Sequence, residues 1–227
     1  MHANMSGEPA LRPPDILAAG PRCAGLSGLA CIAALAATLS AAPAAAQVAP
    51  PDARSVASTV CVACHGEDGN SPIDVFPRIA GLQEGYFVKQ LRDFQSGRRR
   101  SDVMAPIVAA LKPEDFQPLA AYYAGRKPKP DAPAARRMAD VGKLIYYDGN
   151  EETGVPACVG CHMAGGAGYL MYPRIGGQHV TYVKQQLKNF ASGERANDPN
   201  RFMRVVAKRM SDEEMDAVAA YLGDPGR

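Results

Sequence analysis

Apolar side chains recur at helical spacing through much of residues 48–227. Tyr86, Phe87, Leu91 and Phe94 are spaced so that they share one face of a helix. Another helix is predicted to begin after Ser211, because this serine and Glu214 form a capping box ahead of an apolar run. No segment shows the convincing alternation of a strand. The pattern therefore predicts an all-α fold.

Prolines set the expected helix ends. In the first half, the counterpart of the helix after Ser211 is predicted to begin at Pro113, a favoured first-turn residue. Pro118 lies deeper and should bend or shorten that helix. Pro50 and Pro51 should curtail the first helix of this half, because proline interrupts helical hydrogen bonding.

The first 46 residues differ from the rest of the chain. Arg12 and Arg22 precede an alanine-rich apolar run, and Ala44–Ala46 provide small residues for a cleavage site. We therefore predict a secretory signal peptide over residues 1–46. An uncleaved membrane anchor is the alternative, because the run has about the minimum length for a span.

The chain contains an internal repeat. Residues 76–81 match residues 172–177, and residues 86–97 match residues 182–193. After residue 193 the second copy gains three residues, so that Met104 pairs with Met203. Two copies are too few for a solenoid and indicate two duplicated domains.

A proline-rich segment separates the copies. Pro128, Pro130 and Pro133 favour an extended, fairly stiff connector. The predicted organisation is a first domain over residues 48–125, a linker over 126–135 and a second domain over 136–227. Each domain is small for an apolar core of its own, so a bound apolar group would complete it.

The charge balance excludes one class of partner. Lys and Arg number 25 against 23 Asp and Glu, giving a net charge of +2. This balance argues against nucleic-acid binding. The densest cluster, Arg98–Arg100, is interpreted as a solvated loop.

The candidate chemistry lies in a motif that occurs twice. Cys61, Cys64 and His65 form one C-x-x-C-H sequence, and Cys158, Cys161 and His162 form the other. This spacing is the attachment site of a c-type haem: each thiol adds to one vinyl group, and the histidine becomes the proximal iron ligand. The sequence therefore predicts two covalently bound haem c groups.

Two alternatives to haem explain less. A redox dithiol would require a βαβ context, and a zinc site joining the four cysteines would leave both histidines unexplained. The other cysteines, Cys23 and Cys31, lie in the predicted signal peptide, so no disulfide is expected. Bacterial c-type haem is attached outside the cytoplasmic membrane, which agrees with export.

The haem motifs, the Pro-Arg-Ile segments, the Tyr-x-x-x-x-Leu-x-x-Phe-x-x-Gly helices and the late methionines together resemble the dihaem cytochrome c4 family. This resemblance implies two class I cytochrome c domains in tandem, with His/Met-ligated haems that face each other. It also implies that the carbonyl groups of Pro77 and Pro173 accept hydrogen bonds from the proximal histidines.

The second axial ligands are predicted from the repeat. Met104 is the one methionine of the first mature domain, so it is assigned to haem 1, with a ligand donated by the second domain as the alternative. Met203 is assigned to haem 2 because it aligns with Met104. His179 is expected to lie at the surface. The competing candidates in the second domain are Met138, Met163, Met171, Met210 and Met215.

The predicted function is single-electron transfer in the periplasm rather than catalysis. The partners implied by the resemblance are redox proteins such as a cytochrome bc complex and a terminal oxidase, with a loose membrane association as a further expectation. The alternatives are a cytochrome subunit of a dehydrogenase complex, of flavocytochrome or alcohol dehydrogenase type, and a dihaem peroxidase. A peroxidase requires a displaceable axial position, whereas this sequence offers a methionine for each haem.

Overall fold

The computed structural model describes residues 52–131 and 134–226, which belong to one compact unit. The predicted signal peptide and part of the predicted linker lie outside the described residues. Within these ranges the regular structure is helical, and the only β-type pairings are isolated bridges, Asn150 with Val155 and Tyr169 with Tyr172. The prediction of an all-α fold is confirmed. None of the described helices is long and apolar enough to cross a membrane.

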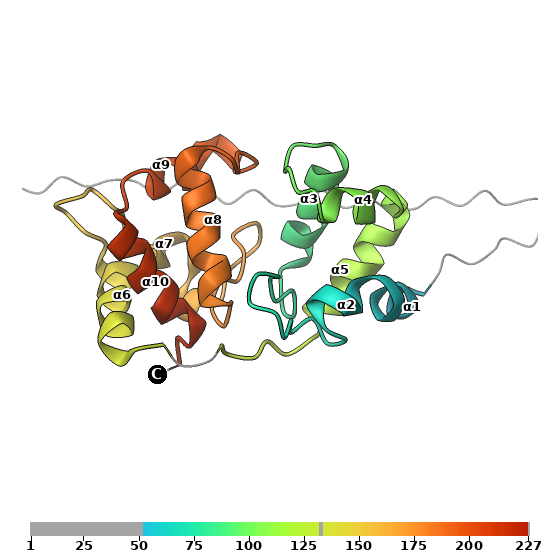
Figure 1. Ribbon diagram of the computed structural model, residues 1–227, viewed down its shortest axis with the longest axis horizontal. Helices are drawn as coiled ribbons and strands as arrows, with labels where there is room; N and C mark the ends of the chain where they lie inside the picture. The colour runs from blue at the N-terminus through green and yellow to red at the C-terminus, as the bar shows by residue number, and fades with distance from the viewer. Residues whose placement is uncertain (1–51, 132–133, 227) are drawn as a thin grey trace, which may run out of the picture. The chain divides into compact units, whose positions relative to one another are not determined.

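The first lobe comprises the helices before the connector (Figure 1). Its elements are α1 (Ala53–Val56), the π-helix η1 (Ala57–Cys61), α2 (Val62–His65), α3 (Glu84–Gln95), α4 (Met104–Ala109), the 3-10 helix η2 (Pro113–Asp115) and α5 (Phe116–Ala124). The segments from α1 to α2 follow one another directly, so a helical path leads into the first haem motif. Helix α3 packs against α4 and α5.

Proline shapes the end of the first lobe as expected. Pro118 lies in the first turn of α5, where its missing N–H group has no intrahelical role. The turn before it, which begins at Pro113, is a 3-10 helix rather than α-helix. The α-helical part is therefore shortened to Phe116–Ala124. Its buried side chains Phe116, Leu119 and Tyr123 join a core formed with residues of α3.

The second lobe follows the connector. Its elements are α6 (Arg136–Asp148), α7 (Val159–His162), the 3-10 helix η3 (Ala164–Gly166), α8 (Val180–Ser192), the 3-10 helix η4 (Pro199–Arg201), α9 (Phe202–Ala207) and α10 (Asp212–Gly223). Helix α10 packs against both α6 and α8 (Figure 1). The predicted capping box is confirmed, because Glu214 N donates to Ser211 Oγ at 3.2 Å and Ser211 N donates to Glu214 Oε2 at 2.8 Å.

A glycine controls the crossing of α6 and α10. A Cβ atom at Gly142 would lie 1.9 Å from the carbonyl oxygen of Ala217. The two backbones can therefore approach closely only without a side chain here. This close approach buries Ile145 and Tyr146 of α6 in the second core, together with Val218 of α10.

Candidate functional site

Each lobe holds one histidine at the end of a short helix, beside a proline carbonyl group. His65 ends α2 and His162 ends α7, and each side chain is 7% exposed. Nδ1 of His65 lies 2.8 Å from the carbonyl oxygen of Pro77, and Nδ1 of His162 lies 3.0 Å from that of Pro173. The hydrogen bonds implied by the family resemblance are therefore present.

These contacts determine which nitrogen of each imidazole ring carries the proton. A carbonyl oxygen only accepts, so Nδ1 carries the proton and donates it, which leaves Nε2 with the lone pair. Burial lowers the pKa of His65 and of His162, and the hydrogen bonds to the proline carbonyl groups oppose this only in part. Both rings are held as neutral imidazoles, the form that binds a metal.

The four cysteines of the two C-x-x-C-H motifs are free and lie beside these histidines. Cys61 and Cys158 are partly buried and pack against the first and the second core, respectively. Burial raises the pKa of the Cys61 thiol and raises that of Cys158 to about 11. Within the described ranges no three His, Cys, Asp or Glu side chains are grouped to hold a metal ion.

A buried phenol accompanies the first cysteine of each motif. Burial and the neighbouring Cys61 raise the pKa of Tyr123, which comes from the last helix of its lobe. Burial and the nearby Cys158 raise the pKa of Tyr146, which comes from the first helix of its lobe. Tyr146 Oη donates to the carbonyl oxygen of Met163 at 2.6 Å, whereas Tyr123 Oη has no hydrogen-bond partner among the described residues.

The two assigned methionines occupy matching places. Met104 begins α4 and packs against the core that includes Cys61, and Met203 lies in α9 and packs against the core that includes Cys158. The competing methionines are either buried within the second core (Met210, Met215) or more exposed (Met138, Met163, Met171). The assignment of Met104 and Met203 as iron ligands remains a prediction.

The expectation for His179 is wrong. Its side chain is buried, at 3% exposed, because Nδ1 lies 2.9 Å from Asp131 Oδ1 and Nε2 lies 2.9 Å from the carbonyl oxygen of Ser71. Both ring nitrogens are therefore engaged within the protein. The residue joins the second lobe to the connector and to the first lobe, a role that its isolated position in the sequence did not indicate.

The interpretation of Arg98–Arg100 as a solvated loop is also wrong for its middle residue. Arg98 and Arg100 are exposed, but Arg99 is partly buried and donates to Tyr182 Oη in the other lobe at 2.9 Å. A signal for this role existed, because Arg99 and Arg195 each follow the last glycine of the repeat by two residues.

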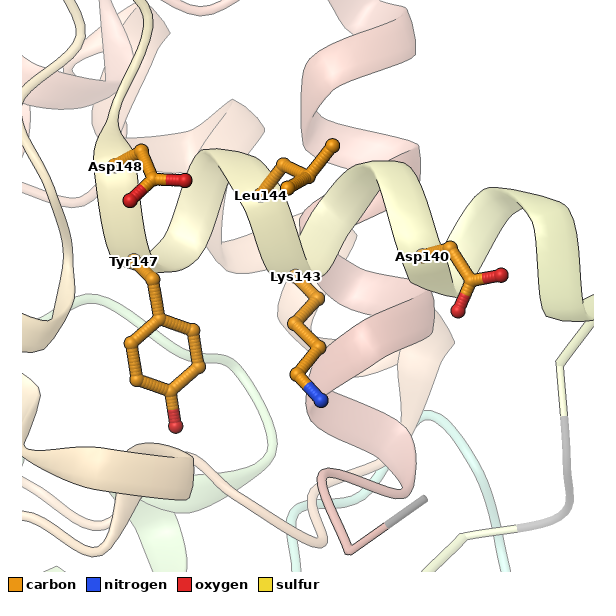
Figure 2. Close-up of a pocket in the computed structure, with 5 residues that line it drawn as sticks. All are labelled: Asp140, Lys143, Leu144, Tyr147 and Asp148. Carbon is orange, nitrogen blue, oxygen red and sulfur yellow. The ribbon is translucent and has the colours of Figure 1, made fainter.

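A depression on the outside of α6 is unrelated to the haem motifs. It is lined by Asp140, Lys143, Leu144, Tyr147 and Asp148, all from this one helix. Figure 2 shows that Lys143 and Tyr147 extend on one side of the helix, whereas Leu144 extends on another. A surface lined by a single helix offers no enclosed space for a cofactor.

The residues of each lobe fit a c-type haem. They supply two free thiols in C-x-x-C-H spacing, a neutral imidazole with Nδ1 engaged, and a methionine that packs on the same core as the first thiol. The buried hydroxyl of Tyr123 is a further donor that the polypeptide alone leaves unsatisfied.

Comparisons with known proteins agree with this chemistry. The Cytochrome c family matches residues 139–224. Cytochrome c4 of Thiocapsa roseopersicina is 47% identical over 183 residues, which cover 79% of this chain and 94% of the relative. A thiosulfate dehydrogenase electron acceptor of Thiomonas intermedia is 38% identical over 195 residues, covering 84% of this chain and 88% of the relative.

A solved structure supports the same conclusion. Reduced recombinant cytochrome c4 from Pseudomonas stutzeri superposes with a TM-score of 0.71 at 35% identity, covering 76% of this chain and 97% of that protein. Similarity therefore extends through both haem motifs and both lobes rather than through one of them. The chain belongs to the cytochrome c4 family of dihaem electron-transfer cytochromes and carries two haem c groups.

Proposed function

We propose that this protein is a periplasmic electron carrier whose two haems are each bound by a histidine and a methionine. His65 and Met104 would ligate the first iron, and His162 and Met203 the second. The observation that carries the proposal is the repeated arrangement of a neutral, proline-oriented imidazole and a methionine on the core beside a C-x-x-C-H motif.

The polypeptide prepares these sites for transfer rather than for substrate chemistry. Bound haem supplies an iron that changes oxidation state by one electron. The carbonyl groups of Pro77 and Pro173 accept hydrogen bonds from the Nδ1–H groups of the two imidazoles and so orient both rings. Met104 and Met203 pack on hydrophobic cores. This packing limits the access of water to the haem sites and keeps the structural rearrangement on electron transfer small. A histidine and a methionine held on each iron would leave oxygen and peroxide no site at which to bind.

Spectroscopy of variants tests the ligand set. Met203→Ala should remove the second haem's share of the sulfur-to-iron charge-transfer band, and Met104→Ala should remove the first haem's share. Met210→Leu is the matched control, because Met210 lies in the second core and its replacement should leave the band unchanged. Loss of the band in the control but not in Met203→Ala would refute the assignment.

The domain limits and export also belong to the proposal. We assign the domains to residues 48–125 and 136–227, the linker to 126–135 and the cleaved signal peptide to 1–46. Mass spectrometry of protein from the periplasmic fraction should give a chain that begins near Gln47 and carries two haems. A full-length chain in the membrane fraction would favour the anchor instead.

A second candidate function is electron acceptor of a periplasmic dehydrogenase. The similarity to a thiosulfate dehydrogenase electron acceptor, 38% identical over 84% of this chain, supports it. The test adds thiosulfate to the oxidised cytochrome with and without a purified thiosulfate dehydrogenase. Reduction only when the enzyme is present would support this function, and no reduction in either mixture would favour other donors, such as a cytochrome bc complex.

A further inference from the structure

Two arginines at equivalent places in the repeat cross between the lobes. Arg99 follows α3 and Arg195 follows α8, in loops that leave the two matching helices. Arg195 is buried and Arg99 is partly buried. Each guanidinium group also lies over an aromatic ring of its own lobe, Phe94 at 4.7 Å for Arg99 and Phe190 at 4.5 Å for Arg195.

The hydrogen bonds of Arg99 reach residues of both lobes. Nη1 donates to Gln90 Oε1 of the first lobe at 2.7 Å. Nη2 donates to Tyr182 Oη at 2.9 Å and to Gln186 Oε1 at 3.1 Å, both in the second lobe. One side chain therefore ties α3 to α8.

Arg195 makes the reciprocal set. Its Nη1 donates to Gln186 of its own lobe at 2.9 Å. Its Nη2 donates to Tyr86 Oη at 2.9 Å and to Gln90 Oε1 at 3.3 Å in the first lobe. Both glutamines thus accept from both arginines. This reciprocity is the property of a self-complementary interface, here between two halves of one chain.

Two backbone N–H groups also donate reciprocally across the lobes. The N–H group of Arg78 donates to Gln178 Oε1 at 2.8 Å, and the N–H group of Arg174 donates to Gln83 Oε1 at 2.7 Å. Each segment that contains the histidine-orienting proline is therefore also bonded to the opposite lobe. Several directional contacts must be met together, which restricts the lobes to one relative orientation.

The side chains of Arg99 and Arg195 make no hydrogen bond to a carboxylate among the described residues. They donate to amide and hydroxyl oxygens, whereas the nearby Asp93 accepts from Lys89, Arg98 and Asn197. A cation in a partly buried site interacts more strongly with other charges than one in water. The ferric form of each haem carries one more positive charge than the ferrous form, so these arginines disfavour oxidation.

We propose that Arg99 and Arg195 form a reciprocal clasp that positions the two lobes for electron transfer between the haems and raises both haem potentials. Helices α3 and α8 carry the buried residues that form the cores beside Cys61 and Cys158, so bonding these helices ties the two haem sites together. The proposal requires two haems but does not depend on which methionine ligates each iron.

The test uses the full-length, haem-loaded protein. Arg99→Gln, Arg195→Gln and the double variant are compared with Arg100→Gln, which removes an exposed arginine from the same loop. Flash photoreduction measures equilibration of an electron between the haems, and a potentiometric titration measures both midpoint potentials. Tyr86→Phe with Tyr182→Phe removes only the accepting hydroxyl groups, in case an arginine variant folds poorly.

The clasp predicts loss of the fast interhaem phase and a downward shift of both potentials from either single Arg→Gln substitution. Arg195→Lys should retain the potentials because it keeps the charge, but not the fast phase because it cannot bridge both lobes. The Tyr→Phe pair should slow the fast phase by less than the arginine variants do, because the bonds from Arg99 to Gln186 and from Arg195 to Gln90 remain. Potentials and rates equal to those of Arg100→Gln would overturn the proposal, while an intact sulfur-to-iron band would show that the ligand assignment is unaffected.

Discussion

Gly142→Ala should separate two helices of the second lobe. A Cβ atom at this position would lie 1.9 Å from the carbonyl oxygen of Ala217, 2.4 Å from its carbonyl carbon and 2.9 Å from the nitrogen of Val218. All three are backbone atoms of α10, so no side-chain rotation can relieve the contact. Helix α6 must therefore shift away from α10 or bend.

The change in unfolding free energy caused by Gly142→Ala is the sum of opposing effects. Inserting a methyl group into a close-packed contact costs about 1–3 kcal/mol, and more where the neighbour is backbone. A gap of 0.5–1 Å also forfeits roughly a quarter to a half of the local dispersion energy, here for Ile145 and Tyr146 against α10. Alanine recovers about 1 kcal/mol of helix propensity relative to glycine. We expect a net destabilisation of about 2 kcal/mol or more, because the steric and packing losses exceed this gain.

Guanidinium unfolding of the haem-loaded protein, followed by far-UV circular dichroism, measures this loss. Gly160→Ala is the control, because no atom lies within 4 Å of a Cβ at Gly160, and the first haem motif already has Ala63 in that place. The control should be at least as stable as the parent protein, because alanine gains helix propensity at Gly160 in α7 without a steric contact. Equal unfolding free energies for Gly142→Ala and the parent would refute the close helix crossing.

Three further predictions concern individual polar groups. Burial raises the pKa of Asp93, but hydrogen bonds from Lys89, Asn197 and Arg98 outweigh it and hold this pKa below its usual value. The carboxylate therefore stabilises the fold above its unfolded pKa of about 3.9 and loses this effect as pH falls through the folded pKa. Asp93→Asn should flatten the acid limb of a curve of unfolding free energy against pH. An unchanged limb would contradict the lowered pKa of Asp93. Ser211→Ala should lower the unfolding free energy by about 1 kcal/mol in a denaturant titration, because it removes a helix cap, whereas Ser192→Ala near the end of α8 should have little effect. Tyr146→Phe should lower the unfolding free energy by about 1 kcal/mol because its hydrogen bond to the carbonyl oxygen of Met163 is lost, whereas Tyr169→Phe, which removes the hydroxyl group of an exposed ring, should have little effect; equal losses in thermal unfolding would count against this contrast.

Local sequence patterns determined much of the protein. The C-x-x-C-H spacing specifies covalent haem attachment because both thiols and the histidine lie within one or two helical turns. Helical periodicity predicted α3, and the Ser211 capping box predicted the start of α10, because both depend on interactions between residues near in sequence. The duplication was likewise visible as repeated segments.

Only the tertiary structure decided which polar residues join the lobes. His179 was expected at the surface and Arg99 in a solvated loop, yet His179 contacts Asp131 and Ser71, and Arg99 contacts Tyr182. Their partners lie far away along the chain, and no local spacing or propensity encodes such pairs. The state of Tyr123 was also hidden, because burial of its hydroxyl group results from the packing of α5 against α3. Burial and long-range hydrogen bonding arise only when the separate helices come together, so the folded chain decides them.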